Sequence, residues 1–153
     1  MTILVLALVI GIVAGLRAMV APAAVALGGW LGWVALAGTP LAFLGNMIAV
    51  AILMLLALGE LVSDQLPTTP SRKVPVQFGG RILTGALSGA AIGASGGQLA
   101  LGAVAGAIGA VIGTLGGASA RGGLATAFGS DRPAAILEDL VAIGLAFAVI
   151  AAA

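Results

Sequence analysis

A single arginine lies inside an apolar stretch that is long enough to cross a membrane. Residues 3–27 are apolar or small except for Arg17. An arginine near the centre of a membrane helix costs roughly 2.5–3.5 kcal/mol on insertion scales. Pro22 lacks the N–H that would bond one turn back, and Gly15 lies two residues before the arginine. We therefore expect a partner for the Arg17 charge and a first helix that is broken between Gly15 and Pro22.

The composition predicts an integral membrane protein. Of the 153 residues, 61% are hydrophobic and 7% are charged, whereas about 25% are charged in ordinary soluble domains. The mean hydropathy is +1.27. The 25 glycines favour closely packed helices, and the alternating pattern of a membrane barrel is absent. We predict one all-α transmembrane domain over residues 1–153.

Several classes of chemistry are excluded by residues that the chain lacks. There is no cysteine and no histidine, so disulfides, thiol nucleophiles, imidazole bases and the usual zinc or haem ligands are ruled out. The net charge of +1 does not favour nucleic-acid binding. We expect no enzymatic activity, no catalytic residues, no bound metal and no cofactor.

Hydrophobic runs and turn signals divide the chain into a bundle of about five transmembrane helices. Thr39-Pro40 is a suitable helix start, and Pro133 is a suitable first-turn residue. The sequence Ser95-Gly96-Gly97-Gln98 divides an uncharged block that is too long for one span. The predicted helices cover residues 3–27, 41–63, 81–96, 99–119 and 134–152, and the predicted polar loops cover residues 64–80 and 121–132.

Five unbroken spans would leave the two chain ends on opposite sides of the membrane. Every Lys or Arg other than Arg17 lies in or next to loops 64–80 and 121–132. Because basic residues gather in cytoplasmic loops, both loops are predicted to be cytoplasmic. The N-terminus would then be cytoplasmic and the C-terminus outside. Arg17, about 20 Å into its helix, would lie in the outer half of the membrane.

Short similarities indicate an inverted repeat, an arrangement common in transporters. Residues 14–18 (AGLRA) resemble 118–122 (ASARG), and residues 59–62 (GELV) resemble 137–141 (LEDLV). These matches pair predicted helices 1 and 2 with helices 4 and 5. In a chain this rich in Gly and Ala, chance similarity is an equally good interpretation.

Glycines recur every three or four residues across predicted helices 3 and 4. This spacing places small residues on one helix face, where another backbone can approach closely. We favour helix packing, either between these two helices or at the face of a homodimer; a pore wall or a sliding surface is the alternative. The predicted packing residues are Gly85, Gly89, Gly93, Gly97, Gly106, Gly109 and Gly113.

Acidic residues occur near the ends of predicted helices 2 and 5. Glu60 and Asp64 are four residues apart and so share one helix face. They could bind a cation, accept a proton or pair with arginine, or Asp64 could only mark the water boundary. Glu138 and Asp139 project about 100° apart on a helix, so we do not expect both to face one partner. Asn46 lies nearest Arg17 in predicted depth.

The chain resembles an uncharacterised family of small bacterial integral membrane proteins, known only as a domain of unknown function. Three segments carry the resemblance: GLRAM with APA at residues 15–23, ELVSDQLP with TPSR at residues 60–72, and LED at residues 137–139. The resemblance implies location in the bacterial inner membrane but no activity. It supports Arg17, Glu60, Asp64, Arg81, Arg121, Glu138 and Asp139 as a common polar set.

The sequence leaves two functions open. In the first, the protein is a transporter or channel for an anionic solute or lipid phosphate, coupled to protons and assembled as a homodimer in the lipid bilayer. Its path would be lined by the polar set and Asn46, with arginines attracting the anion. In the second, the same ion pairs and glycine faces only hold the bundle or oligomer together.

Overall fold

The computed structural model describes residues 2–66 and 70–153, and within these residues the protein is all-α. The prediction of an all-helical fold is confirmed. The described part contains six α-helices and one 3-10 helix and no strand. They are α1 (Thr2–Leu16), α2 (Val20–Trp30), η1 (Ala42–Gly45), α3 (Met47–Ser63), α4 (Pro75–Ser95), α5 (Leu99–Phe128) and α6 (Asp131–Ala152).

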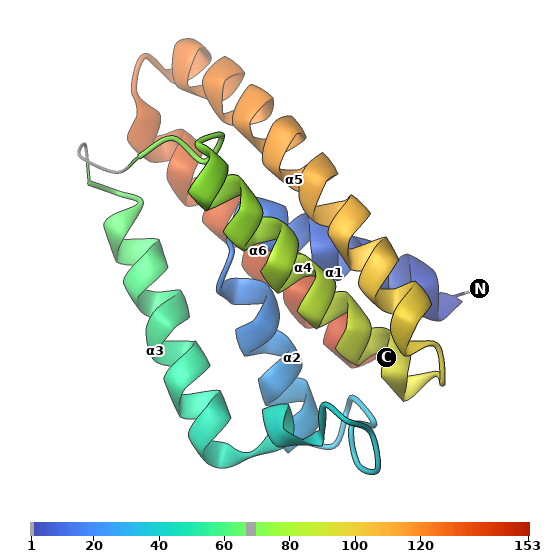
Figure 1. Ribbon diagram of the computed structural model, residues 1–153. Coiled ribbons are helices and arrows are strands. Elements are labelled where there is room, and N and C mark those ends of the chain that lie inside the picture. The colour runs from blue at the N-terminus through green and yellow to red at the C-terminus, as the bar shows by residue number, and fades with distance from the viewer. Residues whose placement is uncertain (1, 67–69) are drawn as a thin grey trace.

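The predicted break in the first helix is confirmed, and the chain reverses direction there. α1 ends at Leu16 and α2 begins at Val20. α1 and α5 run in the same direction. Gly11 packs on Gly106, and Gly15, further along α1, packs on Gly113, further along α5. α2 then turns back, away from the meeting point of the two helices (Figure 1). Pro22 lies in the first turn of α2, where its missing N–H breaks no helical bond.

This reversal corrects the predicted arrangement of the chain ends. The N-terminal side chain of Ile3 lies beside Gly96 at the α4–α5 turn, and Ile150 near the C-terminus lies beside Gly28 at the end of α2. Both termini therefore lie at one end of the bundle, away from the α3–α4 connection (Figure 1). We expected opposite ends because we counted residues 3–27 as one complete span.

Both predicted polar loops are shorter in the structure. α4 begins at Pro75, six residues before the predicted start, because a proline is compatible with the first helical position. α5 continues to Phe128 and ends where Gly129 adopts φ 69°, so Arg121 is helical. The part of loop 64–80 at residues 67–69 lies outside the described residues.

The second and last predicted helices also begin differently. The segment predicted as the start of helix 2 forms η1, and α3 begins only at Met47. Asn46 is its N-cap, because the side-chain oxygen accepts a hydrogen bond from the Ile48 N–H at 2.8 Å. α6 begins at Asp131, which places Pro133 in its first turn.

The glycine series packs helices within the chain, which is one of the two packing arrangements that we favoured. A Cβ on Gly106 would lie 2.1 Å from the Gly85 carbonyl oxygen, and one on Gly109 would lie 2.1 Å from that of Leu8. α5 thus uses adjacent faces against α4 and α1. Gly97 is an exception to the prediction: it has φ 71° in the α4–α5 turn, and a Cβ there would have nothing within 4 Å. Helices of the same chain cover these glycine faces. The homodimer stays a prediction, and it would have to form through another surface.

The helix directions do not support an inverted relation between predicted helices 1 and 4. An inverted repeat requires the two members of a pair to run in opposite directions. α1 and α5 carry the similar segments around Arg17 and Arg121, yet they run parallel. The similarity between these segments does not mark an inverted repeat, because both arginines reach the same end of the bundle.

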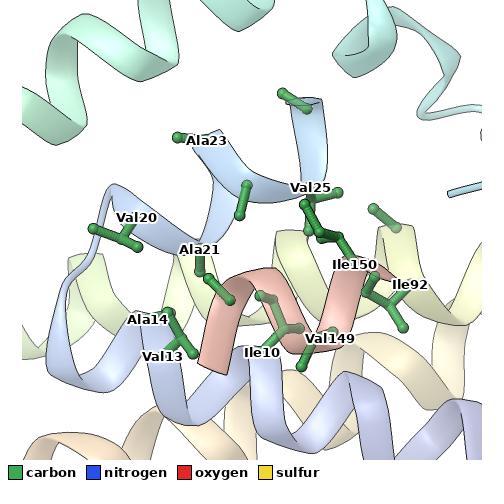
Figure 2. Packing of buried hydrophobic residues seen from close by; sticks show 14 of the residues in the cluster. Ile10, Val13, Ala14, Val20, Ala21, Ala23, Val25, Ile92, Val149 and Ile150 are labelled. Atoms are coloured by element: carbon green, nitrogen blue, oxygen red, sulfur yellow. The ribbon is translucent and has the colours of Figure 1, made fainter. Parts of the chain in front are cut away.

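The apolar core lies where α1, α2 and α6 meet, with a contribution from α4. Figure 2 shows Ile10 and Val13 of α1, Val25 of α2 and Ile150 of α6 as members of one apolar cluster. All four side chains are fully buried. Among the described residues, α5 and α6 are long and apolar enough to cross a membrane, while α1, α2 and α3 are shorter apolar helices.

Two glycines of α5 differ in how closely neighbouring atoms pack around them, and this difference can be tested by substitution. We expect Gly106→Ala to lower the free energy of unfolding by roughly 1–3 kcal/mol, because the added methyl group meets backbone on α4. Gly116 on the same helix has nothing within 4 Å of a Cβ, so Gly116→Ala should leave stability unchanged or raise it. Thermal unfolding of the purified protein checks both. Equal stability of the two variants would contradict this packing.

Candidate functional site

The charged residues of the chain gather at one end of the bundle. Four arginines and four carboxylates form a continuous network there, and the structure brings together every charged residue that we predicted as a site residue. They come from the α1–α2 break, the ends of α3 and α5, and the starts of α4 and α6. The members of this charge network are Arg17, Arg72, Arg81 and Arg121 with Glu60, Asp64, Glu138 and Asp139.

Arg17 is the centre of the charge network and is fully buried. Its Nη1 donates to Asp64 and its Nε donates to Asp139 at 2.5 Å, while Nη2 lies 3.6 Å from a Glu138 oxygen. The predicted partner for the Arg17 charge is therefore present as three carboxylates. The predicted depth of Arg17 is wrong, because the reversal of the chain brings it to the same end as the other charges.

Glu138 and Asp139 both face Arg17, contrary to our expectation from helix geometry. The guanidinium group presents donors on two edges. Asp139 bonds to the Nε edge and Glu138 approaches Nη2. Neighbouring residues that project in different directions can therefore share one arginine.

The two helix ends at the break are capped by side chains from other helices. Arg81 Nη1 donates to the carbonyl oxygens of Gly15 at 2.9 Å and Leu16 at 2.8 Å. Glu60 accepts hydrogen bonds from the N–H groups of Ala18 and Met19, both at 2.7 Å. A cation thus lies at the negative end of α1 and an anion at the positive end of α2, the favoured arrangement for helix dipoles.

The two capping side chains also form an ion pair with each other. Arg81 Nη2 lies 3.5 Å from Glu60 Oε1. Glu60 does not contact Arg17 directly, which the sequence had left open. The carbonyl groups of Gly15 and Leu16 and the N–H groups of Ala18 and Met19 are thus bonded within the protein. Glu60 and Arg81 therefore act first as structural partners of the broken helix.

Arg72 belongs to the charge network although we did not predict it as a site residue. It forms two hydrogen bonds to Glu138, at 2.5 and 2.7 Å, and it is 9% exposed. The charge count could have indicated a further arginine, because the predicted set held only three arginines for four carboxylates. The motif TPSR also contains this arginine. Two further residues were missed: Gln65, which donates to Asp139, and Asp131.

Arg121 lies at the outer edge of the charge network. It donates to both oxygens of Asp131, at 2.9 and 2.6 Å, and approaches Glu138 at 3.4 Å. The Asp131 side chain is 61% exposed. The Arg121–Asp131 pair is thus the part of the site that is most accessible to solvent.

A cavity of about 820 Å³ opens next to the charge network. Three of the four arginines are on its wall, whereas Arg17, Glu138 and Asp139 lie behind it. Asn46 is not part of the site, because it caps α3 at the opposite end of that helix. The charged and amide side chains that line the cavity are Glu60, Asp64, Arg72, Gln77, Arg81, Arg121 and Asp131.

The arrangement can bind an anion where an arginine exchanges its carboxylate partner. Within the described residues, no group of three or more acidic side chains is placed to hold a metal ion. The Nε atom of Arg81 and the Nη2 atom of Arg17 are buried and have no hydrogen-bond partner among the described residues.

Comparisons with known proteins do not identify this chain: no family model, no curated protein and no solved structure matches it. The resemblance to the bacterial membrane family therefore stays a prediction.

The charge network predicts that Arg17 contributes more to stability than exposed cations do. Arg17→Ala should lower the free energy of unfolding by about 3–5 kcal/mol, because one buried and two partly buried carboxylates lose a partner. Adding Asp139→Asn should recover part of the loss, since it removes one unpaired charge. The exposed Lys73 offers the control Lys73→Ala. Denaturant unfolding checks the series, and equal midpoints for Arg17→Ala and Lys73→Ala would contradict a central role for Arg17.

Proposed function

We propose that this chain is an integral protein of the bacterial inner membrane. The mean hydropathy of +1.27 supports this, as do the apolar surfaces of α3, α5 and α6. Ile48, Leu55, Val104 and Leu140 are all more than half exposed, and such large apolar surfaces are unfavourable in water. Trp30 and Trp33 are also about half exposed near the end of α2, which suits an aromatic belt at a membrane surface.

The charged end of the bundle would face the cytoplasm. Lys73 and Arg132 lie at this end and outside the charge network, which favours the cytoplasmic side by the positive-inside rule. Since the fold brings both termini to the opposite end, the N-terminus and the C-terminus would both lie outside. The cytoplasmic assignment of the two polar connections is unchanged from the sequence prediction, but that of the N-terminus is reversed.

We propose that the protein transports an anionic solute or a lipid phosphate. The observation that carries this proposal is the 820 Å³ cavity at the charged end, with Arg72, Arg81 and Arg121 on its wall. Guanidinium groups bind phosphate and carboxylate through paired hydrogen bonds. A half-helix end at the charged cavity, as at Ala18 and Met19, is a feature of transporter binding sites.

The exposed Arg121–Asp131 pair is the first point at which an anion would enter. An ion pair at the surface contributes about 0–1 kcal/mol, so an incoming anion can replace Asp131 at little cost. The pairs around Arg17 are buried, and breaking them costs more. Arg121 is therefore the exchangeable contact, while Arg17 holds the network in place.

Exchange of partners gives a route to proton coupling. A carboxylate that loses its arginine while buried is unfavourable as a charged group, so it takes up a proton. Glu60 and Asp64 line the cavity and are paired with arginine in the structure. Binding of an anion to those arginines would be accompanied by protonation of a displaced carboxylate.

The full pairing of the charge network favours a second function. With Asp131, which is paired with Arg121, four arginines and five carboxylates are joined by ion pairs. A non-transporting structural protein would need no more than this. In that function the cavity would have no specific anion, and the ion pairs would only hold the broken helix and its neighbours in register.

Flux in liposomes separates these two functions. We expect the purified protein to move protons together with a phosphate-bearing anion, and Arg121→Gln and Glu60→Gln to reduce that flux at least about tenfold by removing the contacts described above. Arg132→Gln, which changes an exposed arginine outside the network, is the matched control. No flux of any anion in a broad panel would contradict transport and leave the structural function.

The orientation can be tested because the chain has no native cysteine. We expect single cysteines at Thr2 and Ala153 to react with a membrane-impermeant thiol reagent added outside intact cells. A cysteine at Ser71, on the α3–α4 connection, should react only after the cells are opened. If the two termini label from opposite sides, the first helix crosses the membrane and does not reverse at Arg17.

A further inference from the structure

An apolar groove of about 180 Å³ lies between α2, α3 and α6, separate from the charged cavity. Its wall has no exposed polar surface. On each of the three helices the first and last residues that line the groove are seven positions apart, which is about 10 Å along the helix axis. Its two ends are marked by Val20 and Leu27 on α2, Leu61 on α3, and Ile143 and Ile150 on α6.

The groove exists because α3 packs only loosely on the rest of the protein. Ala57 is the one buried residue among the 17 residues of α3. Figure 1 shows α3 standing apart from the other helices. Met54 and Leu58 line the groove and are nevertheless 40% and 58% exposed. The groove is therefore accessible from the outer surface of the bundle, which in a membrane is the lipid side.

The linings of the groove and of the charged cavity adjoin at the start of α2 and near the end of α3. Met19 and Glu60 line the cavity, and their neighbours Val20 and Leu61 line the groove. A molecule that reached from one space into the other would therefore have a charged end beside the arginines and an apolar end between α2, α3 and α6.

We propose that the groove holds an alkyl chain of a lipid whose phosphate binds at the arginines of the cavity. This inference rests on the proposed function and selects, from its two substrate classes, the lipid phosphate. Arg81 and Arg121 supply positive charge for the phosphate, and the groove supplies an entirely apolar surface for the chain. A water-soluble anion would use the cavity alone and would gain nothing from the groove.

Native mass spectrometry with three related probes tests this assignment. The probes are a diacyl phosphatidic acid, glycerol 3-phosphate, which has the same headgroup without chains, and diacylglycerol, which has the chains without the phosphate. We expect phosphatidic acid to bind at least about tenfold more tightly than either of the others. If glycerol 3-phosphate bound as tightly as phosphatidic acid, the groove would not be the site of an alkyl chain, whereas the anion site would stand. Binding of none would overturn both proposals, and equal binding of diacylglycerol would overturn the role of the arginines.

Two alanines on α3 provide matched variants. Ala57 lines the groove, whereas Ala51 is exposed and does not line it. We expect Ala57→Phe to weaken binding of phosphatidic acid about tenfold or more by filling the groove, and to leave glycerol 3-phosphate binding unchanged. Ala51→Phe should bind both probes as the wild type does. Equal phosphatidic acid binding by the two variants would contradict the proposed chain position.

Photocrosslinking of the wild-type protein gives a result that does not depend on a variant folding. A phosphatidic acid with a diazirine in its chain should label groove residues such as Met54, Leu58 and Phe147, as mapped by peptide mass spectrometry. Excess unlabelled phosphatidic acid should suppress this labelling. Labelling confined to lipid-facing side chains outside the groove, such as Leu101 and Ile108 of α5, would overturn the proposal.

Discussion

The structure depends on how the broken first helix is stabilised. Breaking a helix inside an apolar environment exposes carbonyl groups at one new end and N–H groups at the other, and each unpaired group is costly there. Arg81 donates hydrogen bonds to the freed carbonyl groups, and Glu60 accepts hydrogen bonds from the freed N–H groups. Both come from helices that are distant in sequence, so the break also fixes where α3 and α4 begin and end relative to α1 and α2.

The break determines where the charges meet. Because the chain turns back after Leu16, Arg17 lies at the end of the bundle where α3 ends and α6 begins. One change of direction therefore places the buried arginine at the centre of an ion-pair network. The same change leaves α3 attached mainly to α2, which opens the apolar groove beside the charged cavity.

Much of the candidate site could be predicted from the sequence, because only 7% of the residues are charged and each charge in or near an apolar run is conspicuous. Arg17, Glu60 and Glu138 were identified by their position in or near apolar runs. Arg72 was missed because it lies in a proline-rich segment, where a charge is unremarkable. Asn46 was included on predicted depth alone, and depth depends on a helix direction that local sequence does not specify.

The sequence by itself determined that the chain is helical, that glycines bring helices into close contact, and that the first helix breaks between Gly15 and Pro22. These properties follow from local composition and backbone geometry. Only the tertiary structure decided the direction in which the chain leaves that break. The angle between two half-helices is set by the partners of their free ends, here Arg81 and Glu60. Those contacts join residues more than forty positions apart, and no local pattern records them.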